Sequence, residues 1–236
     1  MTAVEVQDLS RSLDADRVYQ NKGNAPLLAM MPSGATRILD VGCGAGDNAV
    51  IIRRDNPGCT VEGITYSHTE AEIAGHHMER CWVFDIERDF PAEFADREFD
   101  MMIFSHVLEH MREPADVLAR FTKHLAPGGI VLIAVPNIVV WRQRIRFLRG
   151  SFDYEPVGLM DETHLRFITY RTAESVLLSR SPDLAIVEKS VQGSVPLWFL
   201  RRHVLPKSWS AAIDRWGERQ WPNLFGGQIL IKAQKA

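Results

Sequence analysis

Short apolar runs alternate with amphipathic segments along most of the chain. Each run is rich in β-branched or large apolar residues and is bounded by polar residues, Gly or Pro, which is typical of buried strands. The predicted strands are Arg37–Gly42, Thr60–Tyr66, Cys81–Asp85, Asp100–His106, Ile130–Val135, Leu184–Val191 and Gln228–Ala233. Strands that alternate with helices form parallel βαβ units. The pattern predicts a doubly wound α/β fold, a mostly parallel seven-stranded sheet with helices on both faces, in which the last two strands are edge or antiparallel additions.

The clearest predicted helix is Glu113–Leu125, where Val117, Phe121 and Leu125 share one apolar face. The Ala-Pro-Gly-Gly sequence at 126–129 is expected to end it. Another helix is expected at Arg171–Ser179.

Two long stretches, at about 137–170 and 193–225, interrupt the alternation of strands and helices. Insertions of this length commonly build binding sites. We therefore expect a single domain over residues 1–236 that carries a helical lid or cap, with substrate specificity in the two insertions.

Composition excludes several classes of protein. The formal net charge of −3 argues against a nucleic-acid partner. The three cysteines, Cys43, Cys59 and Cys81, form no CxxC pair, and the polar N-terminal stretch does not resemble a signal peptide. The longest apolar run, Ile130–Trp141, is too short to span a bilayer. We expect a cytoplasmic protein without a transmembrane segment.

The segment ILDVGCGAG carries the strongest chemical signal, because a buried strand runs into Gly42, Gly44 and Gly46 and a helix follows. Glycines there permit positive φ and a close approach of a ligand to the backbone, while amides at the helix N-terminus face the ligand. The GxGxG spacing differs from the GxGxxG of dinucleotide binders, which argues against a nicotinamide-dependent oxidoreductase. Asp40 just before the glycines suits a ligand with an ammonium group.

With VEGITYS, CWVFDIE, FDMMIFSHVLEH and LAPGGIVLIAVPN following in order, this segment resembles class I S-adenosylmethionine-dependent methyltransferases from Arg37 to Asn137. The stretch LRGSFDYEPVGLMDETHLRFIT is similar to a bacterial subgroup often found with polysaccharide and glycosyltransferase genes. The resemblance implies a Rossmann-like fold that binds S-adenosylmethionine and releases S-adenosylhomocysteine.

By this resemblance, Asp40 and the glycine loop hold the amino-acid end of the cofactor, Asp85 and Ile86 lie beside the adenine, and Ser105 and His106 lie beneath the methyl-bearing sulfur. The implied cofactor-binding residues are Asp40, Gly42, Cys43, Gly44, Gly46, Thr65, Asp85, Ile86, Ser105 and His106. Thr65 stands where the family usually has a ribose-binding acid. A hydroxyl lacks the charge of a carboxylate, so we expect weaker affinity or compensation by Glu70 or Glu72.

The implied chemistry is O-methylation, for which a hydroxyl acceptor needs a general base. His164 is the preferred base, with Asp161 as the residue that orients it; alternatively, Asp161, His164 and Arg166 form a structural network. His106 is a second catalytic candidate that more directly suits cofactor contact, while Glu109 and His110 cap a helix or hold a loop. No metal is expected, since His76, His77 and Cys81 match no common ligand spacing.

The expected acceptor is a hydroxyl of a small molecule or of a sugar or glycan; a quinol, carboxylate or amine acceptor, and a non-catalytic cofactor-binding scaffold, are the alternatives. Four arginines in Trp141–Arg149 and a second basic cluster at Arg201, Arg202, His203 and Lys207 favour a phosphorylated or lipid-linked acceptor, or peripheral contact with an anionic membrane. The simpler interpretation is a helical cap that buries its tryptophans on the sheet and solvates its arginines.

Overall fold

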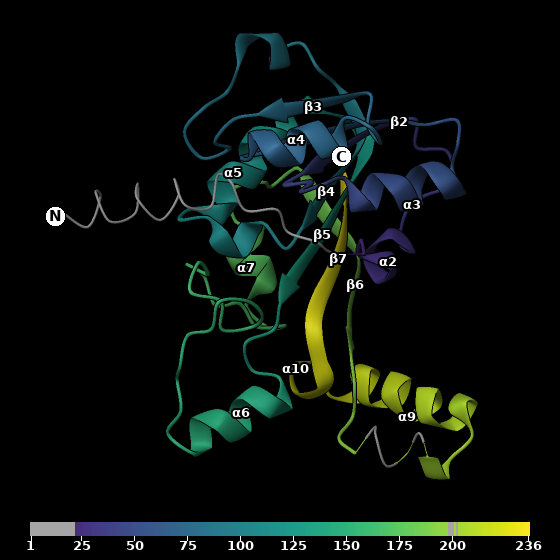
Figure 1. Cartoon of the computed structure of the whole chain (residues 1–236), viewed down its shortest axis with the longest axis vertical. Helices are drawn as coiled ribbons and strands as arrows, with labels where there is room; N and C mark the ends of the chain where they lie inside the picture. Colours follow the sequence, from purple (N-terminus) through teal and green to yellow (C-terminus); the bar gives the residue numbers. More distant parts are fainter. Residues whose placement is uncertain (1–21, 198–200, 202) are drawn as a thin grey trace, which may run out of the picture. The chain divides into compact units, whose positions relative to one another are not determined.

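The computed structural model describes residues 22–197, 201 and 203–236, and these contain seven strands in one sheet. Each predicted strand is confirmed, with small differences at the ends except for the fifth strand, which begins five residues before the predicted Ile130. The strands are β1 (Arg37–Val41), β2 (Thr60–Thr65), β3 (Arg80–Val83), β4 (Phe99–Ser105), β5 (Leu125–Pro136), β6 (Leu184–Gly193) and β7 (Gly226–Lys235), in the order β3-β2-β1-β4-β5-β7-β6 (Figure 1).

The strand order reverses beside β1, which pairs in parallel with β2 on one side and β4 on the other. In open α/β sheets, ligands bind outside the carboxyl ends of the strands at such a switch point. β7 is antiparallel to β5, because Asn137 N, just after β5, donates to Gly227 O at the start of β7 (2.9 Å), and Lys235 Nζ at the end of β7 donates to Leu125 O at the start of β5 (2.8 Å). The expectation of late antiparallel additions is therefore confirmed for β7.

The two helices predicted from the sequence are both shorter in the structure, and α7 spans only Ala173–Leu177 of the predicted Arg171–Ser179. The α-helices are α2 (Ala25–Leu28), α3 (Asp47–Asp55), α4 (His68–Ala74), α5 (Pro114–Phe121), α6 (Trp141–Leu148), α7 (Ala173–Leu177), α9 (Lys207–Gln220) and α10 (Pro222–Phe225), and the 3-10 turns are η1 (Ala92–Phe94), η2 (Leu108–His110) and η3 (Thr122–His124). The predicted helix Glu113–Leu125 is too long: α5 ends at Phe121, and Leu125 with the next four residues belongs to β5. The tighter turn η3 follows the helix, and Lys235 Nζ donates to the carbonyl oxygens of Thr122 in this turn and of Leu125 at the start of β5.

The described residues form two compact units. The first holds the described residues up to Ser105, with Phe121–Leu132 and Lys235–Ala236; the second holds His106–Arg120 and, as far as described, Ile133–Gln234. The expectation of one domain stays a prediction. In the first unit, α4 packs on β2 and β3 (Figure 1).

The core of the first unit is aromatic. Phe94 of η1 lies at its centre with no exposed surface, in edge contact with Trp82, Phe90 and Phe121 and stacked on Phe99. Large apolar groups removed from water supply most of the stabilisation of such a unit. This core supports the strands whose carboxyl ends carry the site residues.

In the second unit, the two insertions contain helices α6, α9 and α10, and α9 and α10 contact β6. The interpretation that the cap buries its tryptophans is wrong for the described residues: Trp209 is 66% exposed, and Trp216 and Trp221 are also exposed. They pack partly on one another instead, with the rings of Trp216 and Trp221 in edge contact at 5.0 Å. Trp198, Phe199 and Arg202 lie outside the described residues.

Candidate active site

The glycine loop joins β1 to α3 and has the backbone expected of it. Gly42, Gly44 and Gly46 have φ of 70°, 53° and 89°, which side chains with a Cβ rarely adopt. Gly46 is the N-cap residue of α3, and a Cβ there would lie 3.2 Å from the backbone of Ala74. Cys43 N donates to Ile64 O at 2.9 Å, which ties the loop to β2. The loop thus leaves amides at the start of α3 for a ligand.

Asp40, the last but one residue of β1, has no exposed surface. Burial raises the pKa of its carboxyl to about 7, against the hydrogen bonds from Asn48 that lower it. Asn48 Nδ2 lies 3.2 and 3.4 Å from the two carboxylate oxygens, and Asn48 Oδ1 accepts from Asn24 N at 2.9 Å. A buried carboxyl with one amide partner is suited to pair with a cation.

Thr65, at the end of β2, donates its hydroxyl hydrogen bond to Glu70 Oε2 at 2.6 Å, and both side chains are buried. The other carboxylate oxygen of Glu70 would lie 3.7 Å from a Cβ at Gly44, so this acid borders the glycine loop. Ser67 caps α4 and accepts a hydrogen bond from Glu70 N at 3.3 Å. Glu70, in the first turn of α4, is therefore the acid that lies at the end of β2, and it is one of the two that the sequence suggested. The other, Glu72, is exposed on the same helix.

Asp85 and Ile86 lie in the turn after β3. Asp85 Oδ1 accepts a hydrogen bond from Glu87 N at 2.9 Å, and Phe84 N donates to Thr65 O at 3.2 Å, which holds the turn against the end of β2. Ile86 is buried. Asp40, Thr65, Asp85 and Ser105 all follow the carboxyl ends of parallel strands or lie in their last residues, which is where a ligand of this fold binds.

Ser105 ends β4, and its hydroxyl accepts a hydrogen bond from Asn24 Nδ2 at 3.2 Å. Asn24, like Asn48, was not singled out from the sequence. Neither asparagine belongs to a spacing pattern, and only the folded chain brings Asn24 to the end of a strand 81 residues away.

His106 follows directly and has a φ of 58°, unusual for a residue with a side chain. Its Nδ1 lies 3.2 Å from Glu109 Oε1 and its Nε2 lies 3.0 Å from Gln228 Oε1, so both nitrogens face acceptors. Partial desolvation of the ring, whose side chain is still 43% exposed, opposes the charged form, but the hydrogen bonds to Glu109 and Gln228 outweigh it and raise the pKa of His106. The arrangement favours an imidazolium, which cannot accept a proton.

His164, the preferred base, lies in the second unit near His110, with ring centroids 4.7 Å apart. Its Nδ1 lies 3.2 Å from Leu159 O, and burial, followed by the neighbouring imidazole of His110, lowers the pKa of His164. The carboxylate of Asp161 accepts hydrogen bonds from Thr163 N and Thr163 Oγ1, at 2.9 and 2.6 Å. The carbonyl of Leu159 therefore orients His164 in this structure, while Asp161 orients Thr163.

Glu109 holds the loop that carries His164. Its carbonyl oxygen accepts from Leu165 N and Arg166 N, both at 2.9 Å. Arg166 in turn donates to Arg112 O and pairs with Glu113 Oε1 at 3.0 Å. This agrees with the alternative that the segment around Glu109 holds a loop.

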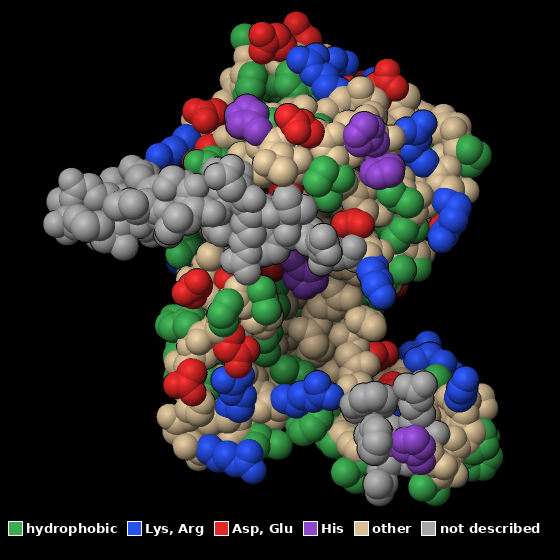
Figure 2. All heavy atoms as spheres, viewed as in Figure 1, with side chains coloured by type: hydrophobic (Ala, Val, Ile, Leu, Met, Phe, Trp, Pro, Cys, Tyr) green, Lys and Arg blue, Asp and Glu red, His purple; other side chains and the backbone are tan. Residues whose placement is uncertain are grey.

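Several basic residues of the insertions are engaged within the second unit. Arg201 Nη2 bonds Asp214 Oδ1 at 2.7 Å and Val195 O at 2.8 Å, and Arg146 pairs with Glu155 at 2.7 Å. Arg144 donates to Val139 O at 2.6 Å. Figure 2 shows basic side chains beside hydrophobic ones over α6, where Leu148 is 88% exposed.

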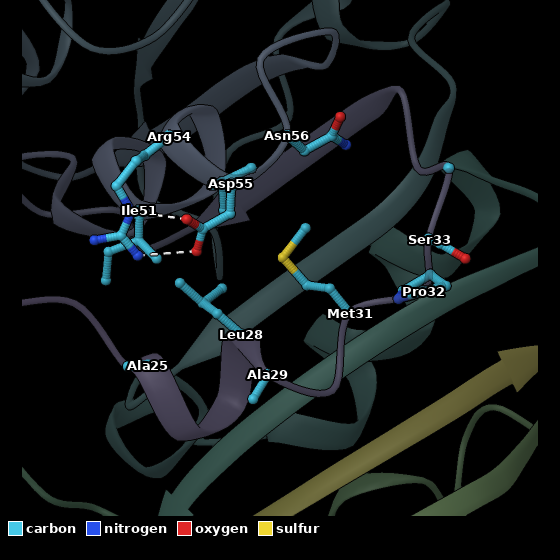
Figure 3. A pocket seen from close by; sticks show the side chains of 12 residues that line it. Ala25, Leu28, Ala29, Met31, Pro32, Ser33, Ile51, Arg54, Asp55 and Asn56 are labelled. Atoms are coloured by element: carbon cyan, nitrogen blue, oxygen red, sulfur yellow. Dashed lines mark hydrogen bonds and ion pairs between the residues drawn. The ribbon is translucent and has the colours of Figure 1, made fainter.

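A cavity of about 480 Å³ lies elsewhere in the first unit, between α2 and the end of α3. Figure 3 shows Leu28, Met31 and the Arg54–Asp55 ion pair around it. Asn56, at the end of α3, donates to Ala35 O just before β1, so this cavity borders the amino ends of the strands, opposite to the glycine loop. None of the cofactor-binding or catalytic residues predicted from the sequence lines it.

Comparisons with known proteins agree with the geometry. A family described as "Methyltransferase domain" matches residues 8–178, more than half of the chain. The ubiquinone biosynthesis O-methyltransferase of Rhizobium leguminosarum bv. trifolii is 30% identical over 160 residues, covering 62% of each protein. Methyltransferase GfsG of Streptomyces halstedii is 29% identical over 149 residues, covering 61% of this chain and 48% of that protein. The chain thus spans about half to two thirds of these curated relatives.

Among solved structures, a SAM-dependent methyltransferase from Archaeoglobus fulgidus has the same fold, with a TM-score of 0.60 and 18% identity over 99% of this chain and 100% of that one. Within the described residues, no helix is both long and apolar enough to cross a membrane. The glycine loop, the acids at the ends of β1 to β3 and these matches together show that the chain belongs to the family of S-adenosylmethionine-dependent methyltransferase domains.

Proposed function

We propose that the protein transfers a methyl group from S-adenosylmethionine to a hydroxyl of a small-molecule or glycan-type acceptor. The tautomer of His164 carries this proposal. A carbonyl oxygen only accepts, so the 3.2 Å contact with Leu159 O requires the proton on Nδ1 and leaves Nε2 with a free lone pair. A sulfonium cofactor, when bound, supplies an excellent leaving group. What the protein must add is a base, because a hydroxyl acceptor loses its proton during methylation.

The residues of the first unit fit this cofactor. Asp40 suits the ammonium group of the amino-acid end. The loop of Gly42, Cys43, Gly44 and Gly46 suits its carboxylate, because the loop leads into the amides at the start of α3.

Glu70, oriented by Thr65, suits the ribose hydroxyls in place of the missing acid on β2. Asp85 and Ile86 suit the adenine, and Ser105 the region near the sulfur, as the family resemblance implies.

His106, after β4, and His164, in the DETHLRF segment, are proposed to have different roles. His106 donates from both nitrogens and so acts as a cation held between Glu109 and Gln228. His164 has a nitrogen free to receive the proton of the acceptor. Asp161 is then a positioning residue that acts through Thr163.

An exposed aromatic cluster in the second unit supports an acceptor with an apolar or ring-shaped face. Phe147 stacks on Phe152 at 5.3 Å, and Phe152 contacts Tyr154 and Phe167 edge-on, both at 5.9 Å. Sugar rings and quinols both stack on aromatic side chains, so the cluster is consistent with a glycan acceptor and with the quinol alternative. Arg142 and Arg149 are exposed on α6 and at its end, the helix that also carries Phe147, and they suit a phosphorylated or lipid-linked acceptor.

The test uses His164→Ala with His76→Ala as a matched control, since His76 is an exposed histidine of the other unit. We expect His164→Ala to bind S-adenosylhomocysteine as the wild type does in calorimetry, and to lower turnover of sugar and quinol acceptors about 10²–10⁴-fold. Equal turnover of the two variants would refute the role of His164. Cofactor binding without release of S-adenosylhomocysteine from any acceptor would favour the scaffold alternative.

A further inference from the structure

Three side chains with metal-binding atoms converge in the second unit. One ligand atom each of Glu109, His110 and His164 lies within 4.8 Å of the other two. We propose that these residues bind a divalent transition-metal ion with the preferences of Zn²⁺. This replaces the expectation from the sequence that the protein holds no metal.

The orientation of His110 supports this site. Its Nδ1 lies 2.9 Å from Thr163 Oγ1 and 3.3 Å from Thr163 O, and the Thr163 hydroxyl donates to Asp161 Oδ1 at 2.6 Å. The Thr163 oxygens therefore accept from Nδ1–H, and Nε2 of His110 keeps its lone pair. Metal-binding histidines are typically oriented by such an outer chain of hydrogen bonds that ends on a carboxylate.

His164 is held in the same way. Its Nδ1 donates to Leu159 O, so its Nε2 is also unprotonated. The two imidazoles that lie edge to face are therefore both in the tautomer that a metal requires, and each is positioned by a separate hydrogen bond.

Glu109 supplies the independent observation. The side chain is buried, its Oε1 accepts from His106 Nδ1, and its Oε2 has no hydrogen-bond partner among the described residues. A buried carboxylate oxygen without a partner is costly, and each such atom in a native structure calls for an explanation such as an ion. A cation between Glu109 and the two histidines would satisfy it.

The donor set selects the class of metal. Two imidazoles and one carboxylate form the three-ligand set of many catalytic zinc sites, which leave a fourth position open. Mg²⁺ and Ca²⁺ prefer oxygen donors. Ligand atoms on one tetrahedral Zn²⁺ lie about 3.3 Å apart, so binding requires side-chain shifts of roughly 1.5 Å or less. With the metal bound, His164 Nε2 is a ligand and cannot take up a proton, so the metal at its open position would instead lower the pKa of the acceptor hydroxyl; this last step rests on the proposed function.

The full chain, stripped of metal with a chelator and dialysed, is titrated with ZnCl₂ in competition with a chromophoric chelator. We expect one Zn²⁺ per chain, about 100-fold or greater weakening in His110→Ala and in His164→Ala, and no change in His76→Ala. Co²⁺ should give a visible absorption band that both variants lose. Circular dichroism and S-adenosylhomocysteine affinity verify that the variants fold. Equal Zn²⁺ binding by wild type, His110→Ala and His164→Ala, or Mg²⁺ binding as tight as Zn²⁺, would overturn the proposal.

Thr163→Val gives a milder test, because it removes the hydroxyl that orients His110 and leaves all three ligands in place. We expect roughly 10-fold weaker Zn²⁺ binding; an unchanged affinity would contradict the orientation argument. The titration needs neither cofactor nor acceptor, so its outcome is separate from that of the proposed function. Methyl transfer by a protein that binds no Zn²⁺ would refute the metal site alone, and His110-dependent Zn²⁺ binding without methyl transfer would refute the function alone.

Discussion

The variant Asp40→Asn tests whether the buried carboxyl of Asp40, near the end of β1, binds a cationic ligand. It also tests whether ionisation of this carboxyl without a ligand lowers the free energy of unfolding. Burial raises the pKa of Asp40 to about 7 in the folded chain without a ligand. In the unfolded chain the same carboxyl titrates near its ordinary value of about 3.9. The folded state therefore retains a proton that the unfolded state has lost between these values, and stability falls as the pH rises from about 4 to 7.

The size of the effect follows from the difference between the two pKa values. A difference of about three units at 1.36 kcal/mol each gives roughly 4 kcal/mol, fully expressed above pH 7. The asparagine variant carries no such penalty, so without ligand we expect it to be more stable than the wild type at pH 8 and to lose this advantage toward pH 4. The ammonium group of the cofactor pairs only with the ionised acid. Its affinity for the wild type should fall about tenfold between pH 8 and pH 6.

Two measurements check this reasoning. Denaturant unfolding of both proteins without ligand, from pH 4.5 to pH 8, gives the stability difference, and calorimetry with S-adenosylhomocysteine at pH 6, 7 and 8 gives the affinities. Asp40→Asn should bind more weakly, with no comparable fall toward pH 6. A stability difference between the two proteins that does not change with pH would refute the raised pKa. An equal pH slope of affinity in both proteins would show that Asp40 does not face the ammonium group.

Three further outcomes are expected. Glu70→Gln should weaken S-adenosylhomocysteine binding about 10-fold or more in calorimetry, because a charge-assisted bond is lost, whereas exposed Glu72→Gln should bind as the wild type does; equal affinities would exclude a ribose contact. Burial opposes ionisation of Asp100, but hydrogen bonds from Thr36 and Arg37 hold its pKa at about 2. Because water screens these exposed hydrogen bonds, Asp100→Asn should cost about 1 kcal/mol of unfolding free energy above pH 4, a cost that disappears toward pH 2; a constant cost would contradict this. Phe94→Ala should cost about 3–5 kcal/mol in denaturant unfolding, and a loss below 1 kcal/mol would show that the aromatic core collapses around the gap.

The sequence by itself determined the strands and the glycine loop, because both depend on local physics. A buried parallel strand needs a short continuous apolar run, and the positive φ values of Gly42, Gly44 and Gly46 follow from the one residue type that adopts them freely. The end of α5 could not be predicted in this way. The chain there passes into the turn η3 and then into β5, where Lys235, more than a hundred residues later in the chain, donates to the carbonyl oxygens of Thr122 and Leu125.

Which polar groups meet was decided only by the tertiary structure. The sequence suggested that an acid near Thr65 replaces the missing carboxylate, and the cap of α4 places Glu70 there. Proximity along the chain suggested that Asp161 orients His164, yet the folded loop turns the carboxylate to Thr163 and, through it, to His110.

Glu109 and His164 are 55 residues apart, and neither the burial of that carboxylate nor its partners follow from any spacing. Hydrogen bonds between distant side chains depend on the relative placement of whole elements, which hydrophobic packing sets and which a local sequence pattern does not record.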